Sequence, residues 1–354
     1  MVSAKYMRDS GIIGRRRRRI NRHPGECGAA ARRGRCGAMR TPWHDPAKHR
    51  MMPGMNPFLA MLVALATSVP AKPAALDPVA ADTLKRNIEK DRLDTQQKLK
   101  SDTTSYLATV ERRDFGEKSS LTVGRDSTND VHIEDPGVEP HHLRVTVMGD
   151  SFHVEVMDEH ARFKVKDSEV REATLGPSSI GVGRFKLRLS HQRYPAIIVF
   201  DPQSPHFKLY HGLKYFPVDL SYRYLLALTP NPEPDTMIIM STRGNARRAV
   251  RVGWFDFQVG KTSCRLEATR LLEPGIGEKN ISVFFRDATT SKQTYEVGRY
   301  VDVESLADGR YVLDFNLAYN PACAFSDHYN CPIPPKANTL KVAIRAGEMD
   351  SHYH

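Results

Sequence analysis

Several signatures of catalysis are missing from this chain of 354 residues. It contains no Gly-rich phosphate loop, no Gly-x-Ser-x-Gly turn that would carry a nucleophilic serine, and no His-Glu-x-x-His zinc motif. These absences remove the hydrolase and nucleotide-binding classes that such motifs identify. No other motif in the chain points to a particular reaction.

Excess positive charge is also missing outside the first fifty residues, although the whole chain carries a formal net charge of +11. Residues 1–50 contain 14 Lys and Arg against 3 Asp and Glu, which leaves 38 residues of each sign for the rest. Proteins that bind nucleic acids present basic residues along the phosphate backbone. The neutral remainder therefore argues against a nucleic-acid partner.

The longest apolar run, FLAMLVALATSV at residues 58–69, is shorter than the ~20 residues that a membrane-spanning helix needs. Basic residues 48–50 precede it, and the small-residue site Ala-Leu-Ala lies at 64–66. This order is typical of a signal peptide. We therefore predict a signal peptide at 51–72, preceded by a disordered basic leader at 1–50 that is absent from the mature protein. A cytosolic protein with a buried helix here is the alternative.

The predicted compartment is outside the cytoplasm, either periplasmic or secreted, and the membrane is contacted only through the cleaved signal peptide. Residues 73–103 are predicted to form a Pro/Ala-rich linker and a short amphipathic helix, since Leu84, Ile88, Leu93 and Leu99 have a loosely helical spacing. The helical pattern extends to about residue 109.

Short runs that alternate apolar and polar residues dominate the chain after residue 114. Gly, Asp and Pro separate them at intervals of roughly 8–12 residues, a pattern typical of antiparallel sandwiches or barrels. The fold class is therefore all-β, with a sandwich at 104–192 packed on a second β-rich module at 193–348 and a tail at 349–354. The clearest predicted strands are SLTVGR, VHIED, LRVTVMG, FHVEVMD, RFKVKD and FKLRLS, followed by AIIVFD, TMIIMS, VRVGWFDFQV, ISVFFRD, YVLDFN and KVAIRAG.

The segment at residues 121–145 resembles the start of a forkhead-associated (FHA) domain. Gly124 and Arg125 match the Gly-Arg that follows the first strands of that family, and His142 occupies the position of its structural histidine. The resemblance implies a β-sandwich in which Arg125 anchors a loop.

Two departures from the FHA pattern argue against phosphopeptide binding. Glu139 stands where the family has a serine that binds phosphothreonine, and Pro140 follows it. A carboxylate repels a phosphate dianion. The later Asn-Gly-Thr loop is replaced by Glu-His-Ala at 159–161. No phosphopeptide partner is therefore expected.

The C-terminal third resembles a bacterial family known as domain of unknown function 1684. The matching segments, in order, are TYEVGRYVDV (294–303), LDFNLAYNPACAF (313–325), CPIPPKANTLKVAI (331–344) and RAGE (345–348). The resemblance implies that the family covers most of residues 85–348, with the FHA-like part as its first half. It implies no reaction.

Cys323 and Cys331 lie eight residues apart in a chain that is predicted to be exported. Exported cysteines at close spacing usually pair, so a disulfide is predicted between them. Two alternatives stay open, namely a zinc site completed by His328 and a cysteine nucleophile with His328 as its base. Cys264 is interpreted as an inert buried thiol. No metal and no cofactor are predicted.

Amide and carboxylate groups cluster just before Cys323, beside a tyrosine. Such groups can line a pocket for a small polar ligand, but Asn and Asp before Pro also cap turns and satisfy loop backbone groups. Arg299 and Glu348 could contribute to the same pocket or pair as an ion pair. The candidate ligand pocket comprises Asp314, Asn316, Tyr319, Asn320, His328, Arg299 and Glu348.

Taken together, these features favour a non-catalytic binding or interaction module of the cell envelope. Its partner would be a small molecule or an envelope protein. The competing hypothesis is a hydrolase-like enzyme for small molecules that uses Asp314, Asn316 and His328. The two hypotheses differ in geometry, because the enzyme requires these side chains to converge on one pocket.

Overall fold

The computed structural model describes residue 73 and residues 76–353, all of which belong to one compact unit. The predicted basic leader and signal peptide lie outside the described residues. Strands dominate the fold, so the all-β class is confirmed. No helix within the described part of the chain combines the length and the apolar character needed to cross a membrane.

The N-terminal helix α1 (Pro78–Ser101) begins inside the segment that was interpreted as a linker, and it ends before residue 109, to which the helical pattern was expected to extend. Asp77 is its N-cap, and its side chain accepts hydrogen bonds from the backbone N–H groups of Val79 and Ala80. Proline is well suited to the first helical position because its missing N–H would have no partner there. The Asp-Pro pair therefore starts a helix of 24 residues.

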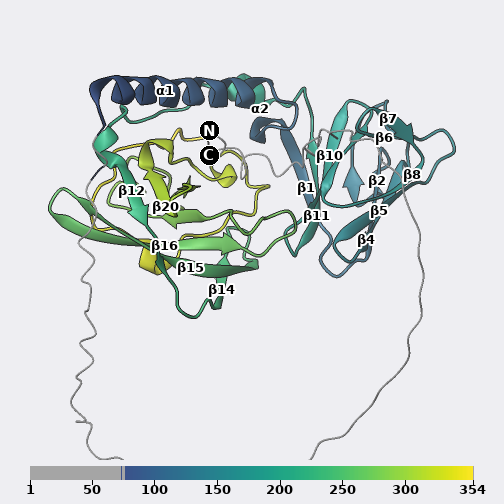
Figure 1. Cartoon of the computed structure of the whole chain (residues 1–354). Coiled ribbons are helices and arrows are strands. Elements are labelled where there is room, and N and C mark those ends of the chain that lie inside the picture. Colours follow the sequence, from purple (N-terminus) through teal and green to yellow (C-terminus); the bar gives the residue numbers. More distant parts are fainter. Residues whose placement is uncertain (1–72, 74–75, 354) are drawn as a thin grey trace, which may run out of the picture. The chain divides into compact units, whose positions relative to one another are not determined.

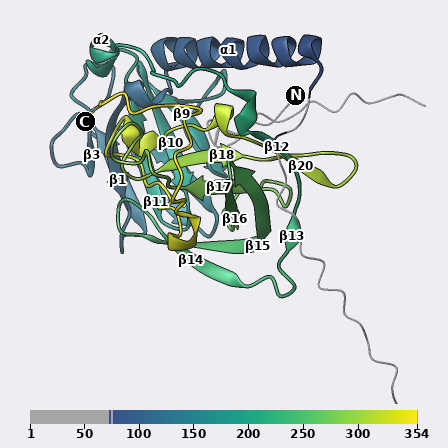
Figure 2. The same cartoon turned by 90° about the vertical axis from the view of Figure 1, so that its left-hand side faces the viewer.

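Helix α1 runs along the second module, as Figures 1 and 2 both show. Ile88, Arg92 and Leu99 form its buried face, whereas Leu93 is 65% exposed, so the predicted apolar stripe was only partly right. The Arg92 guanidinium donates to the carbonyl of Asn316 at 3.4 Å and lies 4.7 Å from the centre of the Tyr215 ring. These contacts attach the helix to the C-terminal part of the chain.

The first module is a sandwich of two sheets. One sheet has the order β3-β2-β4-β5-β8, and the other has the order β1-β11-β10-β9-β6-β7. Alternate residues such as Phe152 and Val154 fill the space between them and are fully buried. The strands are β1 (Thr109–Asp114), β2 (Ser120–Gly124), β3 (Val131–His132), β4 (Leu143–Met148), β5 (Ser151–Val156), β6 (Phe163–Val165), β7 (Ser168–Val170), β8 (Glu172–Leu175), β9 (Ser178–Val182), β10 (Phe185–His191) and β11 (Pro195–Phe200).

Strand β11 lies between β1 and β10 in the second of these sheets. The predicted module boundary at residue 193 therefore falls in the turn of one hairpin, β10–β11. In this sheet Leu187 and Val199 point into the sandwich core. Because side chains alternate along a strand, Ile198 lies on the opposite face. The register places Ile198 directly between Arg112 of β1 and Arg188 of β10.

The second module contains a larger sheet of order β13-β15-β16-β17-β18, to which β14 adds beside β15, and a three-stranded sheet of order β12-β20-β19. Aromatic side chains such as Phe255, Phe257 and Phe315 fill its core. The strands are β12 (Arg223–Ala227), β13 (Thr229–Pro230), β14 (Thr236–Met240), β15 (Ala246–Val259), β16 (Thr262–Leu271), β17 (Ser282–Phe285), β18 (Arg299–Asp302), β19 (Glu304–Ser305) and β20 (Arg310–Asp314).

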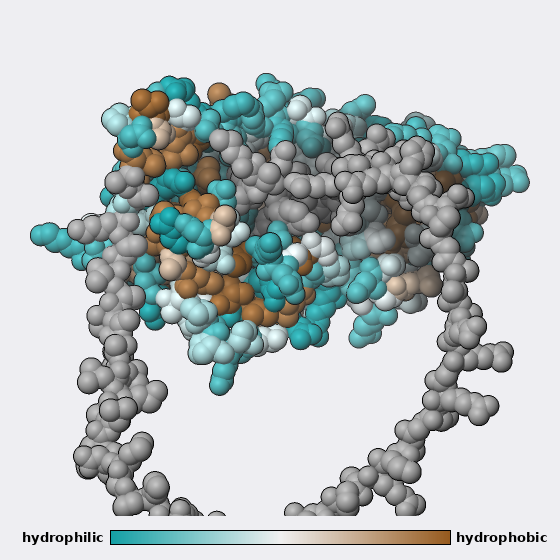
Figure 3. All heavy atoms as spheres, viewed as in Figure 1, coloured by the Kyte–Doolittle hydropathy of each residue, from teal (hydrophilic) through white to brown (hydrophobic). Residues whose placement is uncertain are grey.

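Short helical turns complete the described structure. Helix α2 (His206–Leu209) connects the modules, and five 3-10 turns occur at Tyr106–Ala108, Leu220–Tyr222, Phe315–Leu317, Ala322–Ala324 and Lys336–Asn338. Apolar side chains gather on the surface over β14, β15 and β16 (Figure 3), where Ile238 and Met240 of β14 are about half exposed.

One predicted strand, KVAIRAG at residues 341–347, does not form. Some of its backbone groups bond to side chains, and the carbonyls of Val342 and Gly347 accept single hydrogen bonds from the backbone N–H groups of Ala288 and Phe216. The N–H of Ile344 donates to the Asp287 carboxylate at 2.9 Å, and Arg299 donates to the carbonyl of Ile344 at 2.9 Å. The alternation of apolar and polar residues could not predict that Asp287 and Arg299 would take these backbone hydrogen bonds, because both residues lie far from residues 341–347 in the sequence.

Candidate functional site

Asp314 and Asn316, which were predicted to line a pocket, bond to the loop that contains them and to a neighbouring loop. Asp314 accepts hydrogen bonds from the backbone and side-chain N–H groups of Asn316 at 3.0 and 2.9 Å. Asn316 exchanges two further hydrogen bonds with the backbone of Asp219. Burial raises the pKa of Asp314. Both residues thus have the loop-capping geometry that the sequence left open as an alternative.

Asn320 and Glu348 bond to each other in the same way. The Asn320 amide donates to Glu348 Oε1 at 3.1 Å, and the backbone N–H of Asn320 donates to Glu348 Oε2 at 3.2 Å. The second amide hydrogen of Asn320 reaches the carbonyl of Met349 at 2.8 Å. The pair fastens the C-terminal segment to the turn at residues 318–320, and both side chains are buried.

Arg299 pairs with Asp287 rather than with the Glu348 carboxylate. Its guanidinium lies 2.9 Å from Asp287 Oδ2, and both side chains are almost fully buried. It also donates to the backbone carbonyls of Ile344, Ala346 and Glu348. Burial lowers the pKa of Arg299, and the nearby Asp287 carboxylate opposes that effect. These contacts belong to a structural ion pair inside the second module.

His328 lies apart from this group, at the boundary with the sandwich. Its carbonyl accepts a hydrogen bond from Arg112 of β1 at 3.4 Å. Burial, followed by the positive charge of Arg243, lowers the pKa of its imidazole. The residues that the enzyme hypothesis requires therefore do not share a pocket.

Cys323 and Cys331 are neighbours in space, and both are buried and form no disulfide with each other in this structure. The backbone N–H of Cys323 donates to Cys331 Sγ at 3.3 Å. The predicted disulfide is therefore not formed here and stays a prediction for the oxidised protein. The hydrogen bond to Cys331, together with burial, raises the pKa of Cys323, which disfavours a thiolate at Cys323. Burial acts against a lowered pKa at Cys331, but the hydrogen bonds from Cys323 outweigh it and lower the pKa of Cys331. Within the described residues, no group of three or more His, Cys, Asp or Glu is placed to hold a metal.

The FHA-like residues organise one end of the sandwich. His142 is buried and bonds through Nε2 to the carbonyl of Arg162 at 2.8 Å and through Nδ1 to the backbone N–H of Glu139 at 3.0 Å. Arg125 is exposed and donates from Nε to the carbonyl of Val138. A Cβ atom on Gly124 would lie 2.2 Å from the carbonyl oxygen of Pro140, so only glycine fits there.

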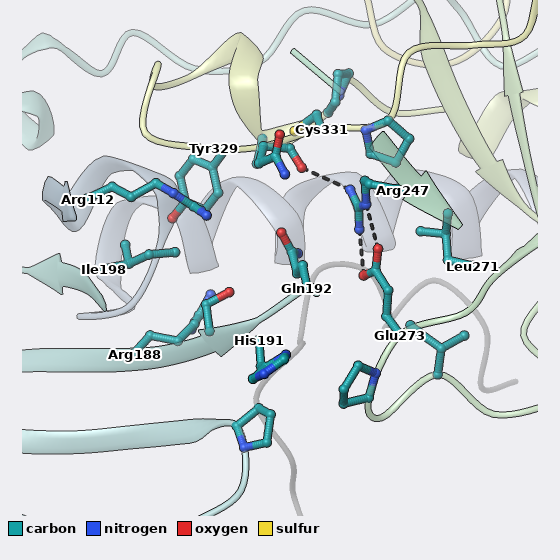
Figure 4. A pocket seen from close by; sticks show the side chains of 18 of the residues that line it. Arg112, Arg188, His191, Gln192, Ile198, Arg247, Leu271, Glu273, Tyr329 and Cys331 are labelled. Carbon is teal, nitrogen blue, oxygen red and sulfur yellow. Dashed lines mark hydrogen bonds and ion pairs between the residues drawn. The ribbon is translucent and has the colours of Figure 1, made fainter. Parts of the chain in front are cut away.

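A cavity of about 140 Å³ lies where the outer face of the β1–β11–β10 sheet meets the second module (Figure 4). Among the predicted site residues, only Tyr319 and the cysteine Cys331 line it. The remaining lining residues come from β1, β10, β11, β15, β18, the end of β16 with the segment after it, residues 319–332, Tyr106 and Pro177. The segment at residues 319–332, which contains Cys323 and Cys331, thus forms one wall of the cavity, although mostly with other side chains than those predicted.

The sandwich contributes a row of three side chains to the cavity, Arg112, Ile198 and Arg188, which Figure 4 shows side by side. Arg112 is buried and lies 2.8 Å from an oxygen of Asp114, which Arg243 also contacts. Arg188 stacks over the Phe200 ring at 4.7 Å, and its Nε is buried without a hydrogen-bond partner. Arg188 contacts no carboxylate of the described residues.

The second module contributes a closed ion pair at the cavity edge. Arg247 binds Glu273 through two N–H groups at 2.5 and 2.6 Å and also donates to the backbone carbonyl of Asn330 (Figure 4). Each charge is therefore neutralised within the pair. This pair positions residue 330 in the wall of the cavity.

Asn330 is the most unusual lining residue. Its side chain is 4% exposed, and neither its amide nitrogen nor its amide oxygen has a hydrogen-bond partner. His191 also lines the cavity with an unpartnered Nδ1, since its Nε2 bonds to the carbonyl of Gly149. Buried polar groups without partners are rare in folded proteins and cost roughly 1–3 kcal/mol each. Their concentration here marks the cavity as a candidate binding site.

Sequence reasoning missed Arg188, Arg247 and Asn330. The position of Arg188 in the run FKLRLS did place it on the face opposite the core, which was the available signal. Nothing in the sequence indicated that the face would be covered by residues 319–332. Asn330 lies inside the segment that the sequence singled out, but it was not distinguished from the other polar residues there.

Comparison with known proteins agrees with this architecture. The first module matches the FHA domain over residues 121–180. The chain belongs to the family described as "Protein of unknown function (DUF1684)", whose profile matches residues 208–349. No curated protein matches the chain.

Several solved structures are similar to parts of the chain. The solution structure of an uncharacterized protein from Haloarcula marismortui is 35% identical and covers 44% of this chain and 85% of that chain, with a TM-score of 0.35. The FhaA FHA domain, crystallised with the intracellular domain of Rv3910, is 20% identical and covers 23% of this chain and 79% of that chain, with a TM-score of 0.18.

Proposed function

We propose that this protein is a non-catalytic binding module of the cell envelope whose ligand site is the cavity between the sandwich and the second module. The observation that carries the proposal is the set of buried, unpartnered polar atoms of Arg188, His191 and Asn330 around one pocket. A ligand that bonds to them would remove the cost of leaving them unsatisfied.

The alternative of an enzyme at Asp314, Asn316 and His328 loses its support, because Asp314 and Asn316 bond to loop groups and His328 lies elsewhere. The FHA-like end of the sandwich is not proposed as a phosphothreonine site. Glu139 places a carboxylate at the family's phosphothreonine-binding position, and Arg125 already donates to a backbone carbonyl.

A thermal-shift screen of small metabolites against the mature protein tests the cavity. A ligand at one hundred times its dissociation constant is expected to raise the unfolding free energy by about 2.7 kcal/mol. Ala322→Phe places a ring in the cavity and should abolish the ligand's thermal shift. Ala227→Phe, at an exposed position of β12, should preserve that shift. A shift that survives Ala322→Phe would place the ligand elsewhere. A phosphothreonine peptide is expected to give no shift.

Export and the disulfide are tested together by the intact mass of material recovered outside the cytoplasm. The chain is expected to start near Thr67 or a few residues later, with two hydrogens fewer than the reduced form because Cys323 and Cys331 have paired. A bridge that closes a loop of this length stabilises the fold by roughly 2–3 kcal/mol. Cys264 should remain a free thiol. A mass that retains residues 1–50 would contradict export, and two free thiols would contradict the bridge.

A further inference from the structure

We infer that the cavity binds a small organic carboxylate and that Arg188 is the residue that holds its charged end. The inference rests on the proposed binding function and specifies the chemical class of the ligand. It follows from the charges, the unpartnered groups and the walls of the cavity, considered in turn.

Arg188 is the lining arginine without an acidic partner among the residues that the structure describes. Arg112 contacts Asp114, and Arg247 is bound by Glu273 through two hydrogen bonds. Since Asp114 also contacts Arg243, it does not fully neutralise either arginine. The surroundings of Arg188 are therefore positive, which favours an anion.

The geometry of a guanidinium favours oxyanions. Its planar fork presents parallel N–H donors that match two oxygens of a carboxylate or a phosphate, and the apolar walls then decide between the two. The ring of Phe200 packs against the Arg188 guanidinium at 4.7 Å and restrains its orientation, while the buried Nε still lacks an acceptor. One carboxylate oxygen would satisfy that nitrogen.

Asn330 supplies a second set of hydrogen-bonding groups from the opposite module. Both polar atoms of its buried side chain lack partners, so its NH₂ can donate to the ligand and its carbonyl can accept from a ligand hydroxyl. The Arg247 bond to its backbone carbonyl, at 2.9 Å, holds the residue in place. A ligand would thus be bound from both modules.

The rest of the wall favours an organic acid over inorganic phosphate. Apart from Ser190 and Gln192, it consists of aliphatic side chains, prolines and tyrosine rings, which solvate the second charge of a phosphate poorly. An apolar cavity of about 150 Å³ accepts benzene, and this cavity has about 140 Å³. A carboxylate with a compact apolar body fits both the size and the chemistry. The apolar and aromatic lining residues are Ile198, Leu271, Ile276, Pro274, Pro321, Pro332, Tyr106, Tyr300, Tyr319 and Tyr329.

Isothermal titration of the full chain with benzoate, benzamide and inorganic phosphate tests this inference. Benzoate is expected to bind, and benzamide, which has the same shape without the charge, should bind at least 10-fold more weakly. Arg188→Gln should weaken benzoate binding by about 10- to 100-fold, which corresponds to the loss of a charged hydrogen bond, and should change benzamide binding by less than about 3-fold. Arg144→Gln is the matched control, because Arg144 lies on the other sheet of the sandwich beside Glu155.

Each other outcome has a distinct meaning. Equal affinity for benzoate and benzamide would overturn the carboxylate inference but leave the cavity as a binding site. Tighter binding of phosphate than of benzoate would also overturn it. If no probe binds and no metabolite shifts the unfolding temperature, both the inference and the proposed function are wrong. Should Arg188→Gln fail to fold, Arg188→Lys can be measured instead. Lysine keeps the positive charge but lacks the planar N–H donors of the guanidinium, so this variant should still weaken benzoate binding by about 10-fold.

Discussion

Replacing Asp287 with asparagine is expected to lower the free energy of unfolding by about 3 to 5 kcal/mol. Asp287 is the sole acidic contact of Arg299 in the described structure, and both side chains are almost fully buried. The substitution leaves a positive charge without its partner in the core of the second module. It also weakens the bonds that the carboxylate accepts from Thr289 and from the backbone of Ile344.

Chemical denaturation measures this loss, and two further variants show its origin. Asp308→Asn removes the acid of an exposed pair with Arg310, whose side chains are about half exposed, and should cause a much smaller loss because solvent screens the pair. The double variant Asp287→Leu with Arg299→Met removes both charges and should recover part of the stability. If Asp287→Asn were as mild as Asp308→Asn, the buried pair would not stabilise the module.

Gly347→Ala is expected to lower the free energy of unfolding by about 3 kcal/mol or more, because two unfavourable effects add. The backbone of Gly347 has a φ of +79°, where residues other than glycine are strained. A Cβ atom there would also lie 2.6 Å from the carbonyl oxygens of both Ala318 and Phe315. Overpacking of that kind typically costs about 1–3 kcal/mol. The next residue, Glu348, would lose its bonds to the turn at 318–320.

Gly309→Ala separates the two causes. Gly309 has nearly the same φ, +82°, but a Cβ atom there meets nothing within 4 Å. Gly309→Ala should therefore lower the free energy of unfolding only through backbone strain, by about 1 kcal/mol. Urea denaturation of both variants gives the comparison, and equal losses would show that the close approach to Ala318 and Phe315 contributes nothing.

The strands of the sandwich could be predicted because their pattern is local. Residues such as Phe152 and Val154 alternate with polar neighbours, and a strand with one buried face requires that alternation. The pattern failed at residues 341–347, where Asp287 and Arg299 take the backbone bonds that a neighbouring strand would otherwise make. It also missed the start of α1, because the cap at Asp77 lies in a Pro- and Ala-rich stretch.

The candidate site could be predicted only as a region. The segment around Cys323 and Cys331 was recognised from its composition, and it does form a wall of the cavity. The sequence left open whether the individual polar residues cap loops or bind a ligand, and in the structure Asp314 and Asn316 bond to loop groups whereas the Asn330 side chain has no partner. Composition cannot distinguish a satisfied amide from an unsatisfied one.

The sequence by itself determined the all-β class, the FHA-like start of the sandwich and the family of the C-terminal third, because each depends on residues close together in the chain. Only the tertiary structure decided which polar groups remain available to a ligand. Arg188 and Asn330 come from different modules, and whether each is satisfied depends on what the packing of those modules brings near it. The hydrogen bonds and ion pairs that occupy residues such as Arg247 and Arg299 are long-range contacts, which local spacing does not encode.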